Sequence, residues 1–453
     1  MRATDPSSGQ IIAEYPDHDA TEVERRVDAA AGAFPGWSRS SFEERAARMR
    51  RAAELLRERR DTLAALMGTE MGKPLTQGRA EVEKCAVTCD YFAANAQRFL
   101  ADDPVETEAE RSFVAFVPLG VVLAVMPWNF PLWQVLRFAA PSLMAGNTAL
   151  LKHAANVPGC ALAVESILRD AGFPDGVFQT LLIDQHRVGE LIDDPRVAAV
   201  TLTGSTEAGR AIAARAGRAL KRTVLELGGS DPYVVLSDAD LERAATTCVA
   251  ARLVNGGQSC IAAKRFVVVE AARAEFEARV VEGMRRAVVG DPSDPRTQVG
   301  PLAREDLRDA LHRQVGGSLS RGARLLLGGE VPARPGAWYP PTVLTDVRPG
   351  MPAFDEELFG PVAAVVPAVD EPDAVRLANA TRYGLGAAVF TRDRARGSRV
   401  ARDELQAGAC FVNAQVRSDP RLPFGGIKES GYGRELGPFG IREFVNVKSV
   451  WIE

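Results

Sequence analysis

The sequence contains little cysteine and little histidine. Its 453 residues include six cysteines and four histidines. The cysteines have neither CxxC spacing nor a secretory context, which excludes a disulfide scaffold and indicates free thiols in a reducing compartment. No histidine pair has a metal-ligand spacing such as HExxH, and no GxSxG nucleophile motif is present. The sequence therefore predicts no metal site, and it gives little support to a Ser-His-Asp or Cys-His pair.

The chain also lacks a strong net charge. Its 55 basic residues are nearly balanced by 59 acidic ones, giving a formal net charge of −4 at pH 7. No electrostatic field large enough to hold a polyanion follows from this balance, so nucleic acid is not an expected partner. Only seven of the basic residues are lysines. We interpret this scarcity as a composition bias without functional content.

No segment has the pattern of an export signal or a membrane span. The first residues, MRATDPSSGQ, lack an apolar run behind a basic start, which predicts a cytoplasmic protein. Residues 113–133 carry no charge over about the length that a bilayer requires. Three prolines and Gly120 interrupt this stretch and would break such a helix. We therefore expect two strands joined at residues 119–120, and no membrane partner.

The pattern of apolar residues predicts an α/β protein. Residues 17–102 have apolar positions at intervals of three and four, as in amphipathic helices. From residue 122 to 236, short apolar runs alternate with helical segments, and a second round of the same alternation covers residues 240–413, with a helix at 272–289. Alternation of this kind indicates parallel strands with crossover helices. Two such units would enclose a cleft in which a ligand can lie.

Cys260 is the most promising nucleophile. It follows the segment Asn255-Gly256-Gly257-Gln258-Ser259, where a thiol is accessible and backbone N–H groups can stabilise its thiolate. The other five cysteines have apolar or helical neighbours and are interpreted as small hydrophobic residues. The alternative for Cys260 is the same buried, unreactive role.

Glu226 and Asn129 are candidates for acid-base and oxyanion chemistry. Glu226 ends an apolar strand before two glycines, where desolvation would raise its pKa toward the value that a general base needs. A salt-bridged carboxylate is equally compatible with this position. Asn129 lies in the proline-stiffened turn PWNFP and offers a rigid N–H donor to a developing oxyanion. Alone, it could instead cap its own turn.

A turn at residues 204–209 is a candidate phosphate site. The apolar strand VAAVTLT leads into GSTEAG and then a helix, whose first N–H groups suit an anion. The segment is neither a P-loop nor a GxGxxG fingerprint, so a tight strand-to-helix turn is the simpler alternative. His153, beside Lys152 at the end of another strand, is interpreted as a structural or cofactor-edge residue rather than a base.

Eight motifs decide between these alternatives by occurring together and in order. They are PWNFP (127–131), LK (151–152), TGSTEAG (203–209), LELGG (225–229), GQSC (257–260), GDPSDPRTQVGPL (290–302), EELFGPV (356–362) and PFGGIKESGYGRE (423–435). On these motifs the chain resembles the aldehyde dehydrogenase superfamily from end to end. The segments LLKHAANVPGC, LELGGSDP and FVNAQVRSDPRLPFGG are similar to the corresponding segments of the compact bacterial succinate-semialdehyde dehydrogenases.

The resemblance implies an aldehyde dehydrogenase-like α/β fold with two Rossmann-like domains and a small β oligomerisation element. The implied limits are residues 1–103 and 125–230 for the cofactor-binding domain, 231–421 for the catalytic domain, and 104–124, as a hairpin, with 438–453 for the oligomerisation element. Because a free sheet edge favours pairing with another subunit, a homodimer or homotetramer is expected.

The resemblance also implies roles for the three candidate catalytic residues. Cys260, as a thiolate, attacks the aldehyde carbon, while the Asn129 amide and the Cys260 backbone N–H hold the oxyanion. Oxidation of this adduct leaves a thioester, and Glu226 activates the water that hydrolyses it. A carboxylate at position 226 favours hydrolysis to a free acid over transfer to coenzyme A.

The implied oxidant is NAD or NADP, with NAD slightly favoured. The positions that match the family's cofactor contacts are Gly204, Ser205 and Gly209 near the pyrophosphate, Trp128 in the cleft, Glu357 at the nicotinamide ribose and Phe359 near the ring. Lys152 resembles the residue that contacts the adenosine ribose or its 2′-phosphate. Members committed to NAD often have Glu three positions later, where this chain has Ala155.

The expected substrate is succinate semialdehyde or a similar short semialdehyde. A guanidinium can grip its distal carboxylate, and Arg137 lies one helical turn from Gln134, which would put both side chains on the cleft wall. Ser418 is a further candidate by resemblance. If Arg137 instead makes a surface or interface ion pair, a broad-specificity aliphatic or aromatic aldehyde dehydrogenase is expected. A catalytically silent binding protein on this scaffold is the alternative from another class.

Overall fold

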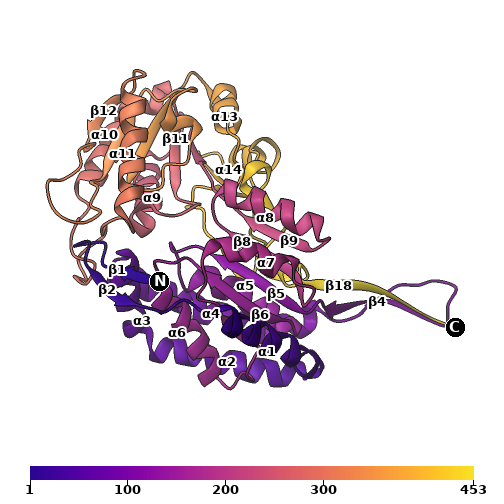
Figure 1. The fold of residues 1–453 in the computed structure, drawn as a ribbon. Helices are drawn as coiled ribbons and strands as arrows, with labels where there is room; N and C mark the ends of the chain where they lie inside the picture. The colour runs from indigo at the N-terminus through magenta and orange to yellow at the C-terminus, as the bar shows by residue number, and fades with distance from the viewer.

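The computed structural model describes residues 1–453, which form two α/β lobes and a projecting arm. Figure 1 shows the lobe that contains β11 above the lobe that contains β5, with the arm extending to one side of the latter. Both predicted α/β units are present, and the predicted fold class is therefore confirmed.

The first lobe is built on a six-stranded sheet. Its strands, in spatial order, are β17 (Gly431–Tyr432), β9 (Arg222–Glu226), β8 (Val197–Thr203), β5 (Val121–Met126), β6 (Thr148–His153) and β7 (Phe178–Thr180). All neighbours are parallel except β17, which pairs antiparallel with β9. The strand β17 brings a late segment of the chain back to this sheet, which the apolar pattern did not predict.

Alternating side chains of β5 supply two separate cores. Val121 and Leu123 belong to one hydrophobic cluster, whereas Val122 and Ala124 belong to another, as expected for a strand covered on both faces. The first face is covered by α1 (Ala20–Arg39), α7 (Val188–Asp193) and α8 (Thr206–Arg218). The second is covered by α2 (Phe42–Glu58), α3 (Arg60–Met71), α4 (Leu75–Phe99), α5 (Trp133–Ala145) and α6 (Pro158–Asp170).

The second lobe is built on a seven-stranded sheet with its own core. Its strands, in spatial order, are β12 (Arg324–Leu327), β13 (Thr342–Thr345), β14 (Val362–Ala368), β11 (Ala263–Val269), β10 (Asp231–Val235), β15 (Gly386–Phe390) and β16 (Ala409–Val412). Its helices are α9 (Leu241–Leu253), α10 (Glu270–Arg285), α11 (Glu305–Leu319), α12 (Pro352–Asp355), α13 (Glu371–Asn379) and α14 (Arg394–Arg399). The helix expected at 272–289 corresponds to α10, which ends four residues earlier.

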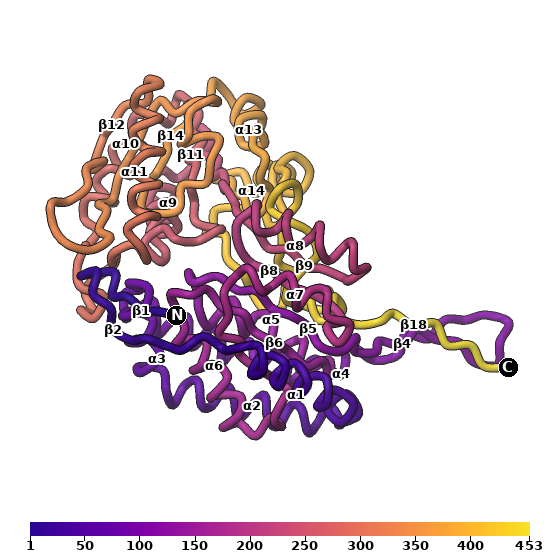
Figure 2. The backbone as a smooth tube through the Cα atoms, viewed as in Figure 1, coloured from indigo at the N-terminus to yellow at the C-terminus, as the bar shows by residue number.

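The arm is a three-stranded antiparallel sheet. It consists of β18 (Val445–Ile452), β4 (Arg111–Pro118) and β3 (Asp103–Pro104), with β4 in the centre. Figure 2 shows β18 and β4 running together to the tip, where the chain ends. The two strands expected on either side of residues 119–120 form as β4 and β5, but they belong to different sheets. No helix in the structure combines the length and apolarity that crossing a membrane requires.

The remaining elements are short. Two antiparallel strands, β1 (Arg2–Thr4) and β2 (Ile11–Glu14), lie where the lobes meet, and the loop between them accepts a hydrogen bond from Trp338 of the second lobe. The other short elements are η1 (Gln185–Arg187), η2 (Val254–Gly257), η3 (Val400–Glu404), η4 (Lys428–Ser430) and α15 (Gly437–Ile441).

Candidate active site

A groove of about 1130 Å³ is lined by residues of both lobes, as the sequence predicts for a cleft between two α/β units. One wall comes from α4 and α5 of the first lobe, and the other from α9 and α10 of the second. Cys260 and the segment 415–418 complete the lining. Cys260 is half-buried there and is therefore not sealed in the core, while its reactivity stays a prediction.

The loop before Cys260 depends on its glycines. Asn255, Gly256 and Gly257 all have left-handed backbone angles, with φ of 55°, 61° and 79°. A Cβ atom at Gly257 would lie 2.2 Å from the carbonyl oxygen of Gly360, so no larger side chain fits there. The sequence NGG therefore turns the chain sharply between α9 and the segment that carries the nucleophile.

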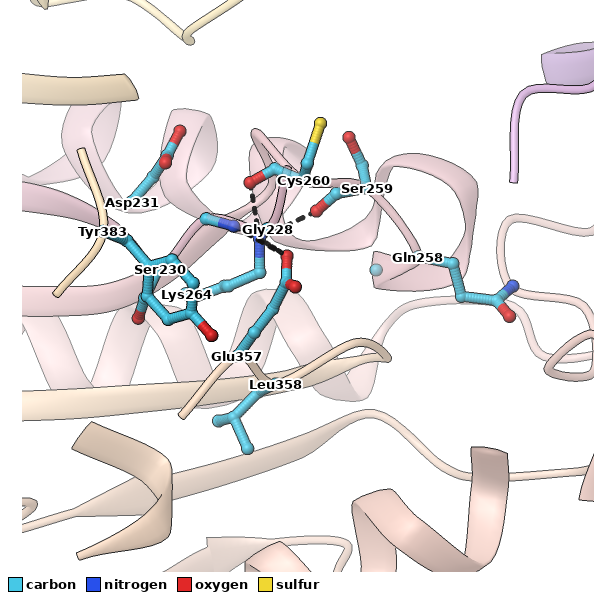
Figure 3. Close-up of polar contacts among 12 residues, drawn as sticks. Gly228, Ser230, Asp231, Gln258, Ser259, Cys260, Lys264, Glu357, Leu358 and Tyr383 are labelled. Atoms are coloured by element: carbon cyan, nitrogen blue, oxygen red, sulfur yellow. Dashed lines mark hydrogen bonds and ion pairs between the residues drawn. The ribbon is translucent and has the colours of Figure 1, made fainter. Parts of the chain in front are cut away.

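Lys264 fixes the two peptide groups that flank Cys260. Its buried amine donates to the carbonyl oxygens of Ser259, at 2.8 Å, and Cys260, at 2.7 Å. The same amine pairs with Glu357 Oε1 at 3.3 Å. Figure 3 shows the Cys260 thiol pointing away from these contacts. The backbone of the nucleophile is thus held while its sulfur remains free.

Burial disfavours the charged form of Cys260. It raises the pKa of the thiol to about 12, and the nearby charges of Arg137 and Lys264 only partly oppose this effect. Stabilisation of the thiolate by backbone N–H groups stays a prediction. A neutral thiol must lose its proton to a base before it can attack a carbonyl carbon.

Asn129 is tied to the nucleophile loop. Its Nδ2 donates to the carbonyl oxygen of Gln258 at 3.1 Å, and the Nδ2 of Asn255 donates to the carbonyl oxygens of both Asn129 and Gln258, at 2.7 and 3.0 Å. The Asn129 amide thus bonds across to another loop rather than capping its own turn, and its second N–H remains available. His153 supports the same turn, because its Nε2 lies 2.9 Å from the carbonyl oxygen of Pro131.

A buried ion pair between Lys73 and Glu81 fixes the turn that contains Asn129. Lys73 donates to the carbonyl oxygen of Asn129 at 2.9 Å and pairs with Glu81. The other oxygen of Glu81 accepts the backbone N–H groups of Leu132 and Trp133, at 3.0 and 2.9 Å, at the start of α5. These contacts fix the turn at both of its ends, and neither Lys73 nor Glu81 was identified from the sequence.

We expect Lys73→Met to lower the free energy of unfolding by about 3–5 kcal/mol, because it leaves Glu81 buried without its cation. Urea denaturation followed by circular dichroism measures this change. Arg348→Met, at an exposed arginine without an ion pair, is the control and should differ from the wild type by less than about 0.5 kcal/mol. Equal stability of the two variants would contradict a supporting role for the Lys73–Glu81 pair.

Glu226 lies at the end of β9 and is not salt-bridged. Both carboxyl oxygens are buried without a hydrogen-bond partner. Burial, and then the neighbouring carboxylate of Glu435, raise the pKa of Glu226 well above its ordinary value, in the direction predicted from the sequence. Its proton-bound form is therefore favoured more than in an ordinary carboxyl group, and the group has no structural partner to lose when it exchanges a proton.

Arg137 is the cation that the surrounding acids share. It forms a buried ion pair with Glu435, donates to Thr203 Oγ1 at 3.2 Å and lies over the ring of Phe424. Its charge lowers the pKa values of Glu435, Glu226 and Cys260 relative to what burial alone would give. The ion pair is buried inside the chain, so the alternative of a surface or interface pair is wrong, and the predicted contact of Arg137 with a substrate carboxylate stays a prediction.

The predicted substrate residues Gln134, Arg137 and Ser418 all line the groove. The Oε1 of Gln134 is buried without a hydrogen-bond partner, and Ser418 Oγ accepts a hydrogen bond of 2.6 Å from Lys84. Lys84, on α4, was missed by the sequence analysis although it also lines the groove. Its amine lies over the ring of Trp133.

The predicted cofactor residues lie at the carboxyl ends of β5, β6 and β8. The chain runs outward from β5 to β6 and β7 on one side and to β8 and β9 on the other, so β5 and β8 meet at a switch point, where ligands bind in open α/β sheets. Gly204 and Ser205 follow β8 directly, and Ser205 caps α8 by accepting the Ala208 N–H at 3.2 Å. A Cβ atom at Gly209 would lie 2.6 Å from Leu227, so this glycine lets α8 pack closely.

The other predicted cofactor residues lie around the same carboxyl-terminal edge of the first sheet. Trp128 and Phe359 are in edge-to-face contact, with ring centroids 5.7 Å apart. Glu357 is partly exposed, and its Oε1 accepts the backbone N–H of Gly229 at 3.0 Å. Lys152 is the last residue but one of β6 and is buried, its amine donates no hydrogen bond, and Ala155 is exposed beyond it.

This edge fits a dinucleotide. Ser205 caps only one N–H group of the first turn of α8, and the others suit a pyrophosphate. The partly exposed Glu357 carboxylate has an oxygen left for ribose hydroxyls. Burial lowers the pKa of Lys152, while Asp184 opposes the shift. No group of three His, Cys, Asp or Glu side chains is arranged to hold a metal ion.

The chain was compared with known proteins. Residues 1–450 match the model of the family described as "Aldehyde dehydrogenase family". A protein of Synechocystis named probable succinate-semialdehyde dehydrogenase [NADP(+)] is 50% identical and covers 99% of this chain and 98% of its own. A succinate semialdehyde dehydrogenase [NAD(P)+] of Escherichia coli K12 is 47% identical over 98% of this chain and 96% of its own. A solved structure of succinic semialdehyde dehydrogenase from Streptococcus pyogenes in complex with NADP+ is 35% identical, with a TM-score of 0.97 over 100% of this chain and 99% of that one.

Proposed function

The chain belongs to the aldehyde dehydrogenase family, and from this premise we propose that it oxidises succinate semialdehyde, or a similar short semialdehyde, to the carboxylic acid with NAD+ or NADP+. The observation that carries the proposal is the arrangement around Arg137, whose charge acts on both the Cys260 thiol and the Glu226 carboxyl beside a groove open to an aldehyde.

In the proposed reaction, Cys260 is the nucleophile. Its Sγ forms a bond to the aldehyde carbon once a base has taken the thiol proton, and the carbonyl oxygen becomes an oxyanion. The free N–H of the Asn129 amide and the backbone N–H of Cys260 stabilise this oxyanion. Because the Asn129 and Cys260 loops are bonded to each other, both donors are fixed before the charge develops.

Glu226 acts on the acyl group that remains on Cys260. A nicotinamide cofactor, when bound, would accept the hydride that must leave the first adduct for a thioester to form. Glu226, once deprotonated, takes a proton from water, whose oxygen bonds to the thioester carbon while the bond to Sγ breaks. The acid leaves, and the thiolate regains a proton. The raised pKa of Glu226 makes it a stronger base than an ordinary carboxylate.

We propose that both NAD+ and NADP+ are accepted, held by Gly204, Ser205 and Gly209 at the pyrophosphate, Trp128 and Phe359 at the ring, Glu357 at the nicotinamide ribose, and Lys152 at the adenosine ribose. Ala155 supports this dual use, because it places no carboxylate where a 2′-phosphate would be repelled. The sequence slightly favours NAD+. The names of the relatives include both NADP(+) and NAD(P)+.

A homodimer or homotetramer formed through the arm is also proposed. The outer edge of β18 has no partner strand in the chain, and its exposed side chains include Val447, Trp451 and Ile452. An exposed eight-residue edge strand that carries apolar side chains is a site for strand pairing with a second copy.

A spectrophotometric matrix tests the proposal. NAD+ and NADP+ are each combined with succinate semialdehyde, glutarate semialdehyde, propanal, butanal and benzaldehyde, and reduced cofactor is followed at 340 nm. We expect kcat/KM for succinate semialdehyde to exceed that for butanal by at least about 30-fold, as one charge-assisted contact would give. Comparable values for all aldehydes would instead indicate a broad-specificity enzyme, and no reduction of either cofactor would refute enzymatic activity.

A further inference from the structure

Lys84 is a cation held inside the groove without a counter-ion. Its amine lies 4.1 Å from the centre of the Trp133 ring and donates to Ser418 Oγ at 2.6 Å, and it forms no ion pair. Two of its three N–H donors therefore have no protein acceptor. Because Ser418 Oγ accepts from Lys84, its own hydrogen is free to donate.

The carboxylates near Lys84 are all committed to other cations. Glu81, on the same helix, pairs with Lys73 and caps α5, and Glu435 pairs with Arg137. The other carboxylates that line the groove are Glu242 and Glu275, both paired with Arg279, and Glu282, paired with Arg285 and Arg286. None of these carboxylates is free to become the partner of Lys84.

The cationic side chains that line the groove also differ in whether they have an ion-pair partner. Arg137, Arg279 and Arg286 each have a carboxylate partner. Arg417 has none, but it is exposed and solvated. Lys84 alone combines partial burial with an unpaired charge, and burying a charge without a partner is unfavourable. A ligand that brings its own carboxylate would remove this penalty.

We propose that Lys84 and Ser418 form the subsite that binds the distal carboxylate of the aldehyde substrate, and that Arg137 is a positioning residue held by Glu435. The proposal rests on the function proposed above. It replaces the prediction that Arg137 binds the distal carboxylate of the substrate. The carboxylate would accept the two free N–H donors of Lys84 and the hydroxyl of Ser418. The face of Trp133 would hold the ammonium in place.

The groups that face Lys84 also predict how the subsite responds to pH. Burial is the largest effect on Lys84 and brings its pKa to about 8; the charge of Arg137 on α5 lowers it too, while Glu81 on α4 opposes the shift and the thiols of Cys85 and Cys260 also face the amine. The amine is charged below this value and neutral above it. In the free enzyme, selectivity for an anionic aldehyde should therefore be lost as the pH rises through about 8.

The test compares succinate semialdehyde with butanal, an uncharged aldehyde of the same chain length, in the full-length enzyme with saturating cofactor. In Lys84→Met, the ratio of their kcat/KM values should fall about 30–100-fold, mainly through KM for the semialdehyde. Lys84→Arg should restore part of the ratio, and Ser418→Ala should lower it less. Lys221→Met is the matched control, because Lys221 is also partly buried with a lowered pKa but lies outside the groove.

The outcomes separate this inference from the proposed function. A wild-type enzyme without preference for succinate semialdehyde refutes the proposed function. A wild-type enzyme with that preference, combined with an unchanged ratio in Lys84→Met, overturns the Lys84 subsite alone. The wild-type ratio should fall between pH 7 and 9, whereas the ratio in Lys84→Met should stay constant. Cofactor binding followed by fluorescence shows that the variant is folded.

Discussion

Replacing Cys260 with serine is expected to lower kcat by at least about 10⁴-fold, with either NAD+ or NADP+ as oxidant. A serine hydroxyl has nearly the same shape as the thiol but is a much weaker acid. Because burial already raises the pKa of the Cys260 thiol to about 12, the same site cannot ionise a hydroxyl near neutral pH. Steady-state formation of reduced cofactor with succinate semialdehyde measures the loss.

The matched control is Cys410→Ser. Cys410 is the other half-buried thiol of the chain, with its pKa raised by burial to about 11, but it lies on the edge strand β16 and does not line the groove. We expect this variant to retain most of the wild-type kcat. Cys260→Ser should still bind NADP+ with wild-type affinity in a fluorescence titration. Turnover above a tenth of the wild-type rate in Cys260→Ser would contradict the assignment of the nucleophile.

The sheets of both lobes could be predicted because each buried strand is a short apolar run between helical segments. The return of the chain to the first sheet through β17 could not. Gly431 and Tyr432 form only two residue pairs with β9, and nothing in their composition indicates a strand. Yet this short strand lies in the segment that carries Glu435 to the ion pair with Arg137. A strand of two residues is too short to show an apolar periodicity, yet it lies in the segment that brings Glu435 into the charge environment of Glu226.

The candidate site was predictable where the chemistry needs a rare residue type in a distinctive turn, as with Cys260 and Asn129. Lys152 was identified, but Lys73, Lys84 and Lys264 were missed because the scarcity of lysine was interpreted as a composition bias. In a chain whose basic residues are mostly arginine, three of seven lysines, at positions 73, 152 and 264, are buried, and Lys84 lines the groove. A compact ammonium on a flexible stem can bond to several carbonyl oxygens in a confined place, as Lys264 does beside Cys260.

Replacing Glu226 with glutamine is expected to preserve the first oxidation and slow the second half of the reaction. Glutamine matches glutamate in shape but cannot take a proton from water, and the loss of a general base costs about 10²–10⁴-fold in rate. Rapid mixing with succinate semialdehyde and excess NADP+ should give a burst of about one reduced cofactor per Cys260, followed by a slow steady state. Thioester hydrolysis, not oxidation, would then limit turnover.

The fold should tolerate this change because neither carboxyl oxygen of Glu226 has a hydrogen-bond partner to lose. Glutamine also places no second negative charge beside Glu435, so the pair of Glu435 with Arg137 is retained. Glu330→Gln, at an exposed glutamate without an ion pair, is the control and should turn over without a burst. A loss of the burst in Glu226→Gln would instead make Glu226 the base that takes the Cys260 proton, since the raised pKa of that thiol requires one.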